Sequence, residues 1–452
     1  MSKCKACAQY EKDIEKLKEE LAYIRFELED IRSKRYKSGR KKPPSDTSSN
    51  AQPPPTKKKG GLFGHIGWFR KKPVKIDHVQ ELQLTSCPTC GGHDLTECKK
   101  VEEHIQEDIV LPQVEATMYR RHHYYCKKCK AIVSLKGSDE LIRSRIGPTA
   151  KSFAIFLRYA VKISERDVQA LFGKAFNLKI AASSIAGFRN KLKEEALPLY
   201  GKLMEALRKG RFIHADETGW KVNSDNYWLW KFSNKNACVS HIDASRGQAV
   251  VDKIIGDTYK GVLISDFFSA YNKIKTKAKQ RCLVHILRDL KKVMEYWHDD
   301  AEVMNYCLRL KKIFLDAITL QNEYKDKRRD KIYCQRRDSL KLSLDDFGFP
   351  NPNKRILKRF AKRLDRHRNE ILTFLYEKNI DFHNNHAEQQ IRPDVIFRKI
   401  TFGNRSLAGA QNHSVIMSIL QTAKLNKIDP IRTLKGILLR SPQQSLPKAL
   451  SP

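Results

Sequence analysis

The sequence predicts a multidomain α/β protein in which a β-sheet carries a site built from acidic side chains. Three observations support this fold class. Short β-rich runs alternate with a helical run from Gly210 onward, helical spacing dominates residues 141–209, and two CxxC pairs mark a small separate domain before them. With 452 residues, 40% of them hydrophobic, the chain is long enough to bury more than one core.

The charge balance indicates a polyanionic partner. The formal net charge is +36, and such an excess of Lys and Arg is typical of proteins that bind nucleic acid. No apolar run approaches the roughly 20 residues of a membrane helix, and the first residues lack the apolar core of a signal peptide. We therefore expect a cytoplasmic protein with no membrane partner. Its 11 cysteines are then expected to be metal ligands or buried thiols rather than disulfides.

Residues 1–35 are predicted to form a coiled coil. Aliphatic residues recur at alternating spacings of three and four, with Glu and Lys between them: Ile14, Leu17, Leu21, Ile24, Leu28 and Ile31. Because such a seam pairs protomers, we expect a homo-oligomer. The alternative is a helix that packs on its own domain.

Residues 36–80 are predicted to be a basic, Pro- and Lys-rich linker. Between residues 31 and 80, 14 Lys or Arg stand against 2 Asp, a net charge of +12. This composition suits phosphate contacts made without sequence readout. A solvated tether has the same composition, and the two roles are compatible.

Residues 81–140 are predicted to bind zinc. Cys87-Pro-Thr-Cys90 is followed, after 35 residues, by Cys126-Lys-Lys-Cys129. Two CxxC knuckles with β-like sequence between them are typical of a tetrahedral Cys4 zinc ribbon, whose closed shell stabilises a small fold and leaves no open position for catalysis. A redox CxxC pair is the alternative interpretation. Substitute ligands would be Cys98, His122 and His123.

Residues 141–209 are predicted to be helical and to resemble a DNA-binding module. A first helix ends near Val161, a second begins at the capping residue Ser164, and a third covers residues 183–192. The spacing is compatible with a helix-turn-helix, although a plain three-helix module has the same pattern. The recognition helix would present Arg189, Lys191 and Lys193 to DNA.

Residues 210–430 are predicted to form the catalytic domain, and residues 431–452 a carboxy-terminal tail. Three strands, a helix and another strand match the order of a ribonuclease-H-like core, with RCLVHIL as a further β-rich run. Asp216 lies on the first strand and Asp266 at the end of the fourth. A helical insertion is expected at residues 289–380, and Glu388 would follow it on a helix that packs back on the sheet.

The three acidic residues Asp216, Asp266 and Glu388 suit metal-dependent phosphodiester chemistry. Two Mg²⁺ ions about 4 Å apart can orient an attacking oxygen and stabilise charge on the leaving oxygen. Hard carboxylate oxygens suit Mg²⁺, or Mn²⁺ in its place. We therefore predict that these residues are the catalytic metal ligands.

Two sets of residues near the acidic site have competing interpretations. Cys282 and His285 have the spacing of half a metal site, but the pair alone is too small, so a packed or DNA-facing role is favoured. The basic residues after Glu388 either clamp the scissile phosphate, which we favour, or form a solvated helix face. They are Arg392, Arg398 and Lys399.

Four further residues are interpreted as structural. His214, beside the first acidic residue, is expected to be a packed histidine rather than a general base. The three tryptophans of the first strands are expected to be core aromatics rather than platforms for a flipped base. They are Trp220, Trp228 and Trp230.

At these motifs the chain resembles a known family, the insertion-sequence-sixty-six family of bacterial DDE transposases. The heptad segment, a GGxxGHxGxxR element at residues 60–70, the Cys4 ribbon, the helical segment and the split acidic core follow one another in that family's order. Its core motifs are similar to HADETGW, SDFFSAY, Cys282-x-x-His285-x-x-Arg288, NNHAEQQIRP and TAKLNKIDP. Leu62-Phe63 depart from the Gln-Pro that the glycine element usually carries.

The resemblance implies a transposase that binds the terminal inverted repeats of an insertion sequence, cleaves at the element ends and transfers the 3′-hydroxyl ends into target DNA. It assigns the metal-ligand roles to Asp216, Asp266 and Glu388. It also implies that the protein is associated with the bacterial nucleoid and that small accessory transposition proteins are possible partners. Two alternatives stay open: a ribonuclease-H-like nuclease without strand transfer, and a DNA-binding repressor on a transposase fold. The intact acidic trio argues against the repressor.

Overall fold

The computed structural model describes residues 5–35, 76, 79, 114–128, 130–324, 330–347 and 354–440. The predictions for the linker at 36–80, the glycine element at 60–70 and three of the four ribbon cysteines lie outside the described residues. Within the described ranges, no helix combines the length and apolar character needed to cross a membrane.

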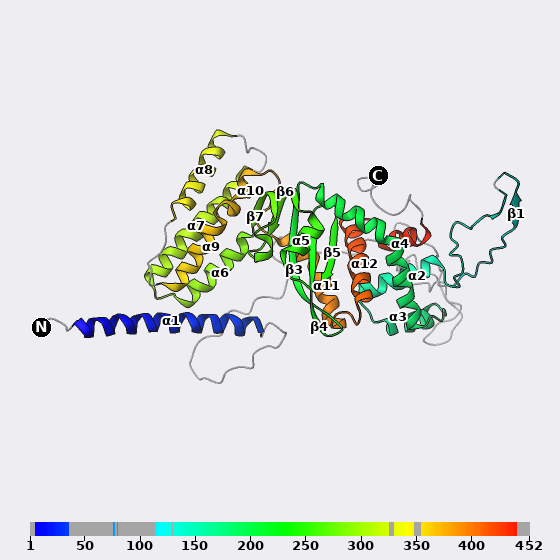
Figure 1. Cartoon of the computed structure of the whole chain (residues 1–452), viewed down its shortest axis with the longest axis horizontal. Coiled ribbons are helices and arrows are strands. Elements are labelled where there is room, and N and C mark those ends of the chain that lie inside the picture. Colours follow the sequence, from blue (N-terminus) through cyan, green and yellow to red (C-terminus); the bar gives the residue numbers. More distant parts are fainter. Residues whose placement is uncertain are drawn as a thin grey trace, which may run out of the picture. The chain divides into compact units, whose positions relative to one another are not determined.

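A five-stranded mixed sheet lies at the centre of the carboxy-terminal half (Figure 1). Its strands are β3 (Phe212–Val222), β4 (Asp225–Ser233), β5 (Cys238–Asp243), β6 (Thr258–Ser265) and β7 (Lys275–Arg281), in the spatial order β5-β4-β3-β6-β7. The first three strands form an antiparallel meander, whereas β6 and β7 run parallel to β3. The crossover between β5 and β6 contains helix α5 (Gln248–Ile255).

The position of the last strand corrects the sequence interpretation. RCLVHIL was expected to be β-rich, but β7 ends at Arg281 and the residues after Cys282 begin helix α6. The true strand, KTKAKQR, is polar and basic, as suits a sheet edge where charged side chains discourage further pairing. Because this strand is polar, its sequence carries no strand-like apolar pattern. The apolar residues after it belong to the buried face of the amphipathic helix α6.

Helices before and after the sheet in the sequence complete its hydrophobic core. They are α2 (Pro148–Phe156), the π-helix η1 (Leu157–Val161), α3 (Glu165–Ala175), α4 (Ala182–Arg208), α11 (Asn385–Thr401), α12 (Leu407–Leu425) and α13 (Pro430–Leu439). Of these, α4, α11 and α12 pack against the strands, whereas α2, α3 and α13 pack on other helices. The predicted cap at Ser164 is confirmed, because its hydroxyl accepts from the N–H of Asp167 in a capping box. Helix α4 extends beyond the expected 183–192, since its buried apolar face continues through Ala196 and Leu203.

The segment between β7 and α11 forms a helical insertion with its own core. Its helices are α6 (Leu283–Tyr296), α7 (Ala301–Glu323), α8 (Lys331–Asp345), α9 (Arg355–Ile371) and α10 (Thr373–Tyr376). Their buried apolar residues form one cluster that also includes Val262 and Ile264 of β6. The insertion is therefore anchored on the parallel side of the sheet, where α9 and α10 pack against β7 (Figure 1).

Helix α1 (Lys5–Arg35) belongs to the same compact unit and uses two different faces. Tyr23 is buried, and the Phe26 ring contacts Trp297 at the end of α6 with a centroid distance of 4.8 Å. The predicted heptad residues lie outside this contact and are all about half exposed: Ile14, Leu17, Leu21, Ile24, Leu28 and Ile31. The helix thus packs on its own unit and still presents an apolar seam.

A two-stranded antiparallel hairpin surrounds the second CxxC knuckle. Strand β1 (His123–Cys126) pairs with β2 (Ala131–Ser134), and Cys126 lies opposite Ala131. Cys126 is the only ribbon cysteine within the described residues. Cys126 therefore ends the first strand of this hairpin, a position compatible with the zinc-ribbon prediction.

Candidate active site

Asp216 and Asp266 lie on neighbouring parallel strands at equivalent positions. The β3–β6 ladder ends with the pair His214 and Ile264, and each aspartate follows two residues later. Strand β6 ends at Ser265, whereas β3 continues to Val222, so Asp216 lies at the level where β6 leaves the sheet. Equivalent register places the two carboxylates close enough that the charge of Asp266 raises the pKa of Asp216. Both residues are partly buried.

A buried arginine holds the loop that carries Asp266. The Arg281 guanidinium donates to the Asp266 carbonyl oxygen over 2.8 Å and to the Ser265 hydroxyl over 3.2 Å. Its Nε pairs with the Glu370 carboxylate over 2.7 Å. Although burial raises the pKa of Glu370, the hydrogen bond from His367 and the charge of Arg281 lower it to about 2, so Glu370 is ionised.

Glu388 reaches the site from the first turn of α11, and Asn384 fixes the start of that helix. The Asn384 amide donates to the carbonyl oxygen of Ala215 over 2.8 Å and shares a 3.1 Å hydrogen bond with His214 Nδ1. Its backbone N–H donates to Cys282 Sγ over 3.3 Å. Asn384 is buried, so the start of α11 is tied directly to the strand residue before Asp216.

The electrostatics of Asp216 indicate a crowded acidic site. Burial, followed by the neighbouring charges of Glu217 and Asp266 and, more weakly, Glu388, raises the pKa of Asp216 to about 8, while an N–H from Glu217 opposes the shift. Carboxylates that raise one another's pKa are stabilised by a divalent cation, and their hard oxygen donors suit Mg²⁺. The residues present therefore fit the expected ion.

Several residues that sequence reasoning missed support the candidate site. Glu217 has only 3% of its side chain exposed, accepts from Tyr271 over 2.6 Å and pairs with Arg246 over 2.8 Å. Arg246 lies between the rings of Trp228 and Phe268. These contacts join the strand of Asp216 to the segment after Asp266. The acidic pair in HADETGW was the only available signal for Glu217, whereas Asn384 was hidden in the NNHAE motif.

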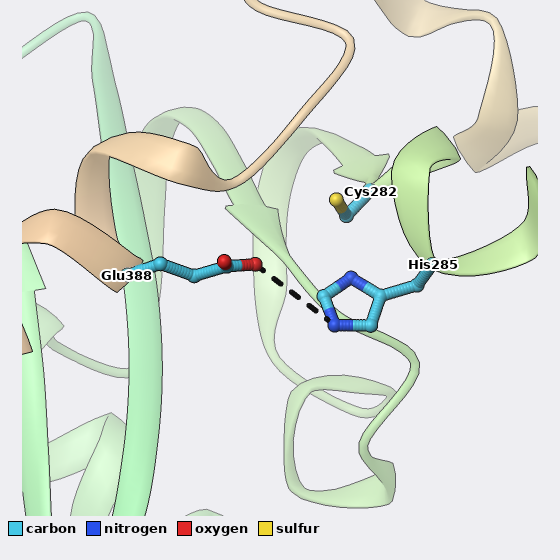
Figure 2. Close-up of side chains that lie close together, drawn as sticks. All are labelled: Cys282, His285 and Glu388. Atoms are coloured by element: carbon cyan, nitrogen blue, oxygen red, sulfur yellow. Dashed lines mark ion pairs between the residues drawn. The ribbon is translucent and has the colours of Figure 1, made fainter. Parts of the chain in front are cut away.

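Cys282 and His285 gain a third member in the structure. Ligand atoms of Cys282, His285 and Glu388 all lie within 4.8 Å of one another, which no other trio of His, Cys, Asp or Glu achieves in the described part of the chain. Figure 2 shows the three side chains converging from α6 and α11, with His285 Nε2 3.9 Å from Glu388 Oε1. The pair therefore lies next to Glu388 of the candidate site, a partner that the sequence spacing does not predict.

The predicted acidic trio is more open than this cluster. Asp216, Asp266 and Glu388 do not all lie within 4.8 Å of one another in the described residues.

The predicted DNA-binding side chains differ in how exposed they are and in whether other side chains or the backbone already hold them. Arg189 has 14% of its side chain exposed and pairs with Glu165 over 2.8 Å, and Lys191 pairs with Glu195 over 2.9 Å. Arg398 is tied to β3, donating to Thr218 Oγ1 and to the carbonyl oxygen of Gly219. The exposed members are Lys191, Arg392 and Lys399. Their roles in DNA binding stay predictions.

The residues interpreted as structural lie in the core. Trp220 and Trp230 are buried, and Trp228 packs under the Arg246 guanidinium. His214 is buried, and this burial, together with the charge of His386, lowers its pKa to about 3 against the hydrogen bond to Asn384 Oδ1. A neutral histidine held by Asn384 is a packed residue, as predicted.

Comparison with known proteins identifies the class to which the chain belongs. Residues 143–412 match the model of the "Transposase IS66 family", which spans more than half of the chain. Residues 85–130 match the "zinc-finger binding domain of transposase IS66", a range that contains Cys87, Cys90, Cys126 and Cys129. The chain belongs to the IS66 family of transposases, as the resemblance in its sequence implied. Transposase and zinc-finger domains together imply DNA binding, and the zinc-finger match supports Zn²⁺.

Distant relatives cover most of the chain. The uncharacterized protein y4qI of Sinorhizobium fredii is 22% identical over 370 residues, which are 74% of this chain and 67% of that protein. The uncharacterized protein y4hP of the same organism is 20% identical over 82% of this chain and 74% of its own length. A third, y4jD, is 21% identical over 83% of this chain and 78% of its own length.

Proposed function

We propose that the chain is a DDE transposase that binds the terminal inverted repeats of a bacterial insertion sequence, cleaves at the element ends and transfers the 3′-hydroxyl ends into target DNA. The observation that carries this proposal is the equivalent placing of Asp216 and Asp266 on two parallel strands, with Glu388 close enough to affect the pKa of Asp216. The strand order β5-β4-β3-β6-β7, with its last two strands parallel to β3, supports a ribonuclease-H-like core.

In this proposal Asp216, Asp266 and Glu388 hold Mg²⁺ or Mn²⁺. Two such ions supply a metal-activated oxygen nucleophile and charge stabilisation on the leaving oxygen. The chain's own contribution is rigidity: Arg281 fixes the backbone of Asp266, and Asn384 fixes the start of the helix that carries Glu388. Preorganised ligands of this kind are what phosphoryl transfer demands of a protein.

Zinc and DNA contacts complete the proposal. Cys87, Cys90, Cys126 and Cys129 hold one structural Zn²⁺. The exposed Arg392 and Lys399, which follow Glu388 on α11, contact DNA phosphates together with Arg288 of α6. The apolar seam of α1 pairs protomers into a homo-oligomer, and small accessory proteins assist the reaction in the cytoplasm.

The deciding experiment is cleavage and joining of DNA that carries the element's inverted repeats, with Mg²⁺ or Mn²⁺. The wild type is compared with Asp216→Asn, Asp266→Asn and Glu388→Gln, and Asp257→Asn is the control because Asp257 is an exposed residue before β6. Loss of joined products in all three variants, with the control active, supports the proposal. Cleavage of intact element ends, with no joining of a precleaved end to target DNA, would favour the nuclease alternative.

The repressor alternative makes a different prediction. It requires that wild type and Asp216→Asn bind the repeats equally and that neither reacts under any metal condition. Because Asp216→Asn keeps the side-chain shape, equal binding with loss of reaction would instead separate catalysis from DNA recognition.

A further inference from the structure

The Cys282–His285–Glu388 cluster has the donor chemistry of a second kind of metal site. Thiolate sulfur and imidazole nitrogen favour a borderline-soft ion such as Zn²⁺, whereas Mg²⁺ prefers oxygen ligands. Three protein ligands with an open fourth position are a common arrangement for zinc. The cluster therefore differs in kind from the all-carboxylate site that shares Glu388.

The geometry is close to what zinc requires. With a Zn–S bond of about 2.3 Å and Zn–N and Zn–O bonds of about 2.0 to 2.2 Å, tetrahedral ligand atoms lie roughly 3.3 to 3.6 Å apart. The ligand atoms here lie within 4.8 Å, and His285 Nε2 is 3.9 Å from Glu388 Oε1. Contraction needs only small side-chain movements. His285 and Glu388 are each about one-third exposed, which leaves an entry path for an ion and its water.

Unsatisfied atoms at the cluster supply a second observation. Glu388 Oε1 and His285 Nδ1 are both buried at the atomic level and have no hydrogen-bond partner among the described residues. A buried polar atom without a partner is unfavourable, and such atoms commonly mark an ion or water. Glu388 Oε1 is also the carboxylate oxygen nearest His285 Nε2, so the unpartnered carboxylate oxygen points to a cation held by this trio.

The protein backbone holds the sulfur in place. Cys282 is the N-cap residue of α6, and its Sγ accepts the N–H of Asn384. Burial raises the pKa of the Cys282 thiol, while the backbone N–H groups of Asn384, His285 and Val284 oppose this shift by stabilising the thiolate, the form that binds a metal. Cys282 thus comes from a rigid junction between β7 and α6, while His285 and Glu388 approach from two helices (Figure 2).

We propose that Cys282, His285 and Glu388 bind one Zn²⁺ ion, and that this ion withdraws Glu388 from the Mg²⁺ site. Zn²⁺ is then an inhibitor that competes for a shared carboxylate. The binding half of this inference stands on the cluster alone, whereas the inhibitory half rests on the proposed function.

The binding half is tested by counting zinc in the full-length protein after equilibrium dialysis. Cys282→Ala and His285→Ala are each expected to hold one zinc ion fewer per chain than the wild type. Cys307→Ala is the matched control, because Cys307 is a buried thiol of α7 outside the cluster. The zinc ribbon contributes equally to every variant, so the difference reports the cluster. Equal zinc content in wild type and His285→Ala, a partly exposed position that tolerates substitution, overturns the proposal.

Cobalt substitution gives an independent readout. Co²⁺ bound through a thiolate absorbs in the near ultraviolet, and Cys282→Ala should lose part of this absorption while Cys307→Ala keeps it. Retention of the full band by Cys282→Ala contradicts a sulfur ligand at this position.

The inhibitory half is tested by adding Zn²⁺ to Mg²⁺-dependent DNA cleavage, with each variant compared to its own rate without zinc. Loss of even an outer-shell partner weakens metal binding about 10- to 100-fold, so the inhibitory midpoint should rise at least about tenfold in Cys282→Ala. An unchanged midpoint overturns the competition. If the wild type shows no Mg²⁺-dependent reaction, the proposed function fails while the zinc count still decides the site.

Discussion

Asp216 and Asp266 each lie two residues beyond the last pair of the parallel β3–β6 ladder, His214 and Ile264. This relationship places two acidic residues that are 50 positions apart in the sequence at one edge of a sheet. The surrounding structure is organised to hold this edge. Arg281 holds the backbone of Asp266, and Asn384 holds the start of the helix that carries Glu388. The buried ion pair between Lys231 and Asp394 anchors the middle of that helix to β4.

Asn384→Ala should loosen Glu388 without touching it. The substitution leaves the Ala215 carbonyl oxygen and His214 Nδ1 buried without their partner, which costs about 1–3 kcal/mol in the free energy of unfolding. Denaturant unfolding and DNA cleavage should both decline. Asn385→Ala, at an exposed neighbouring position, should change neither. Equal effects of the two substitutions would argue against a positioning role for Asn384.

Arg281→Met should destabilise the protein strongly. Arg281 is fully buried, and its removal leaves the ionised Glu370 without its cation, a change that typically costs about 3–5 kcal/mol. Lys277→Met on the same strand is the control, since Lys277 is 56% exposed in its pair with Glu377 and such pairs contribute about 0–1 kcal/mol. Thermal unfolding that is similar for both variants would contradict the proposed support of Asp266.

The raised pKa of Asp216 predicts a pH-dependent stability in the absence of divalent ions. Because the pKa in the folded state is about 8 and the ordinary value is near 4, the folded protein keeps a proton that the unfolded chain loses. This contribution is fully present below about pH 4 and is lost as the pH rises toward 8. As the pH rises from about 4 to 8, the free energy of unfolding should therefore fall less for Asp216→Asn than for the wild type. Mg²⁺ at pH 8 should raise the Tm of the wild type more than that of the variant.

The buried Lys231–Asp394 pair makes an opposite prediction. Asp394 and Lys231 are both fully buried 2.7 Å apart, and His413 lies 2.8 Å from the same carboxylate. Burial raises the pKa of Asp394, but the charge of Lys231 and the hydrogen bond from His413 lower it to about 2. The stabilisation is present above about pH 4 and is lost as the pH falls toward 2.

Asp394→Asn should accordingly cost about 3–5 kcal/mol at pH 7, because it leaves Lys231 as an unpaired buried charge. The gap to the wild type should narrow below pH 4. Urea unfolding at pH 7 and pH 3 measures both values, and a gap that does not depend on pH would contradict an ionised Asp394.

The two faces of α1 can be separated by mutation. Serine at Leu17, Leu21 and Leu28 removes half-exposed apolar side chains and should lower the mass found by light scattering while the Tm is kept. Tyr23→Ala removes a buried contact and should lower the Tm while the mass is kept. A serine variant with unchanged mass would refute self-association through the seam.

Local patterns were enough to predict several features. Ser164 was identified as a helix cap because its role depends only on residues within one turn. The strands of Asp216 and Asp266 were visible because apolar runs end directly before each carboxylate. The strand KTKAKQR was missed, since an edge strand is recognised by its pairing with β6 and not by its own composition.

The sequence alone therefore defines the family, the order of the segments and the acidic residues of the candidate site, because motifs and periodicity are properties of neighbouring residues. The tertiary structure decides which distant residues meet. Three contacts join residues that are about 90 to 170 positions apart in the sequence: Asn384 with Ala215, Arg281 with Glu370, and His285 with Glu388. Their contacts arise because parallel strand pairing and the return of α11 to the sheet bring these segments together, and no local pattern encodes that meeting.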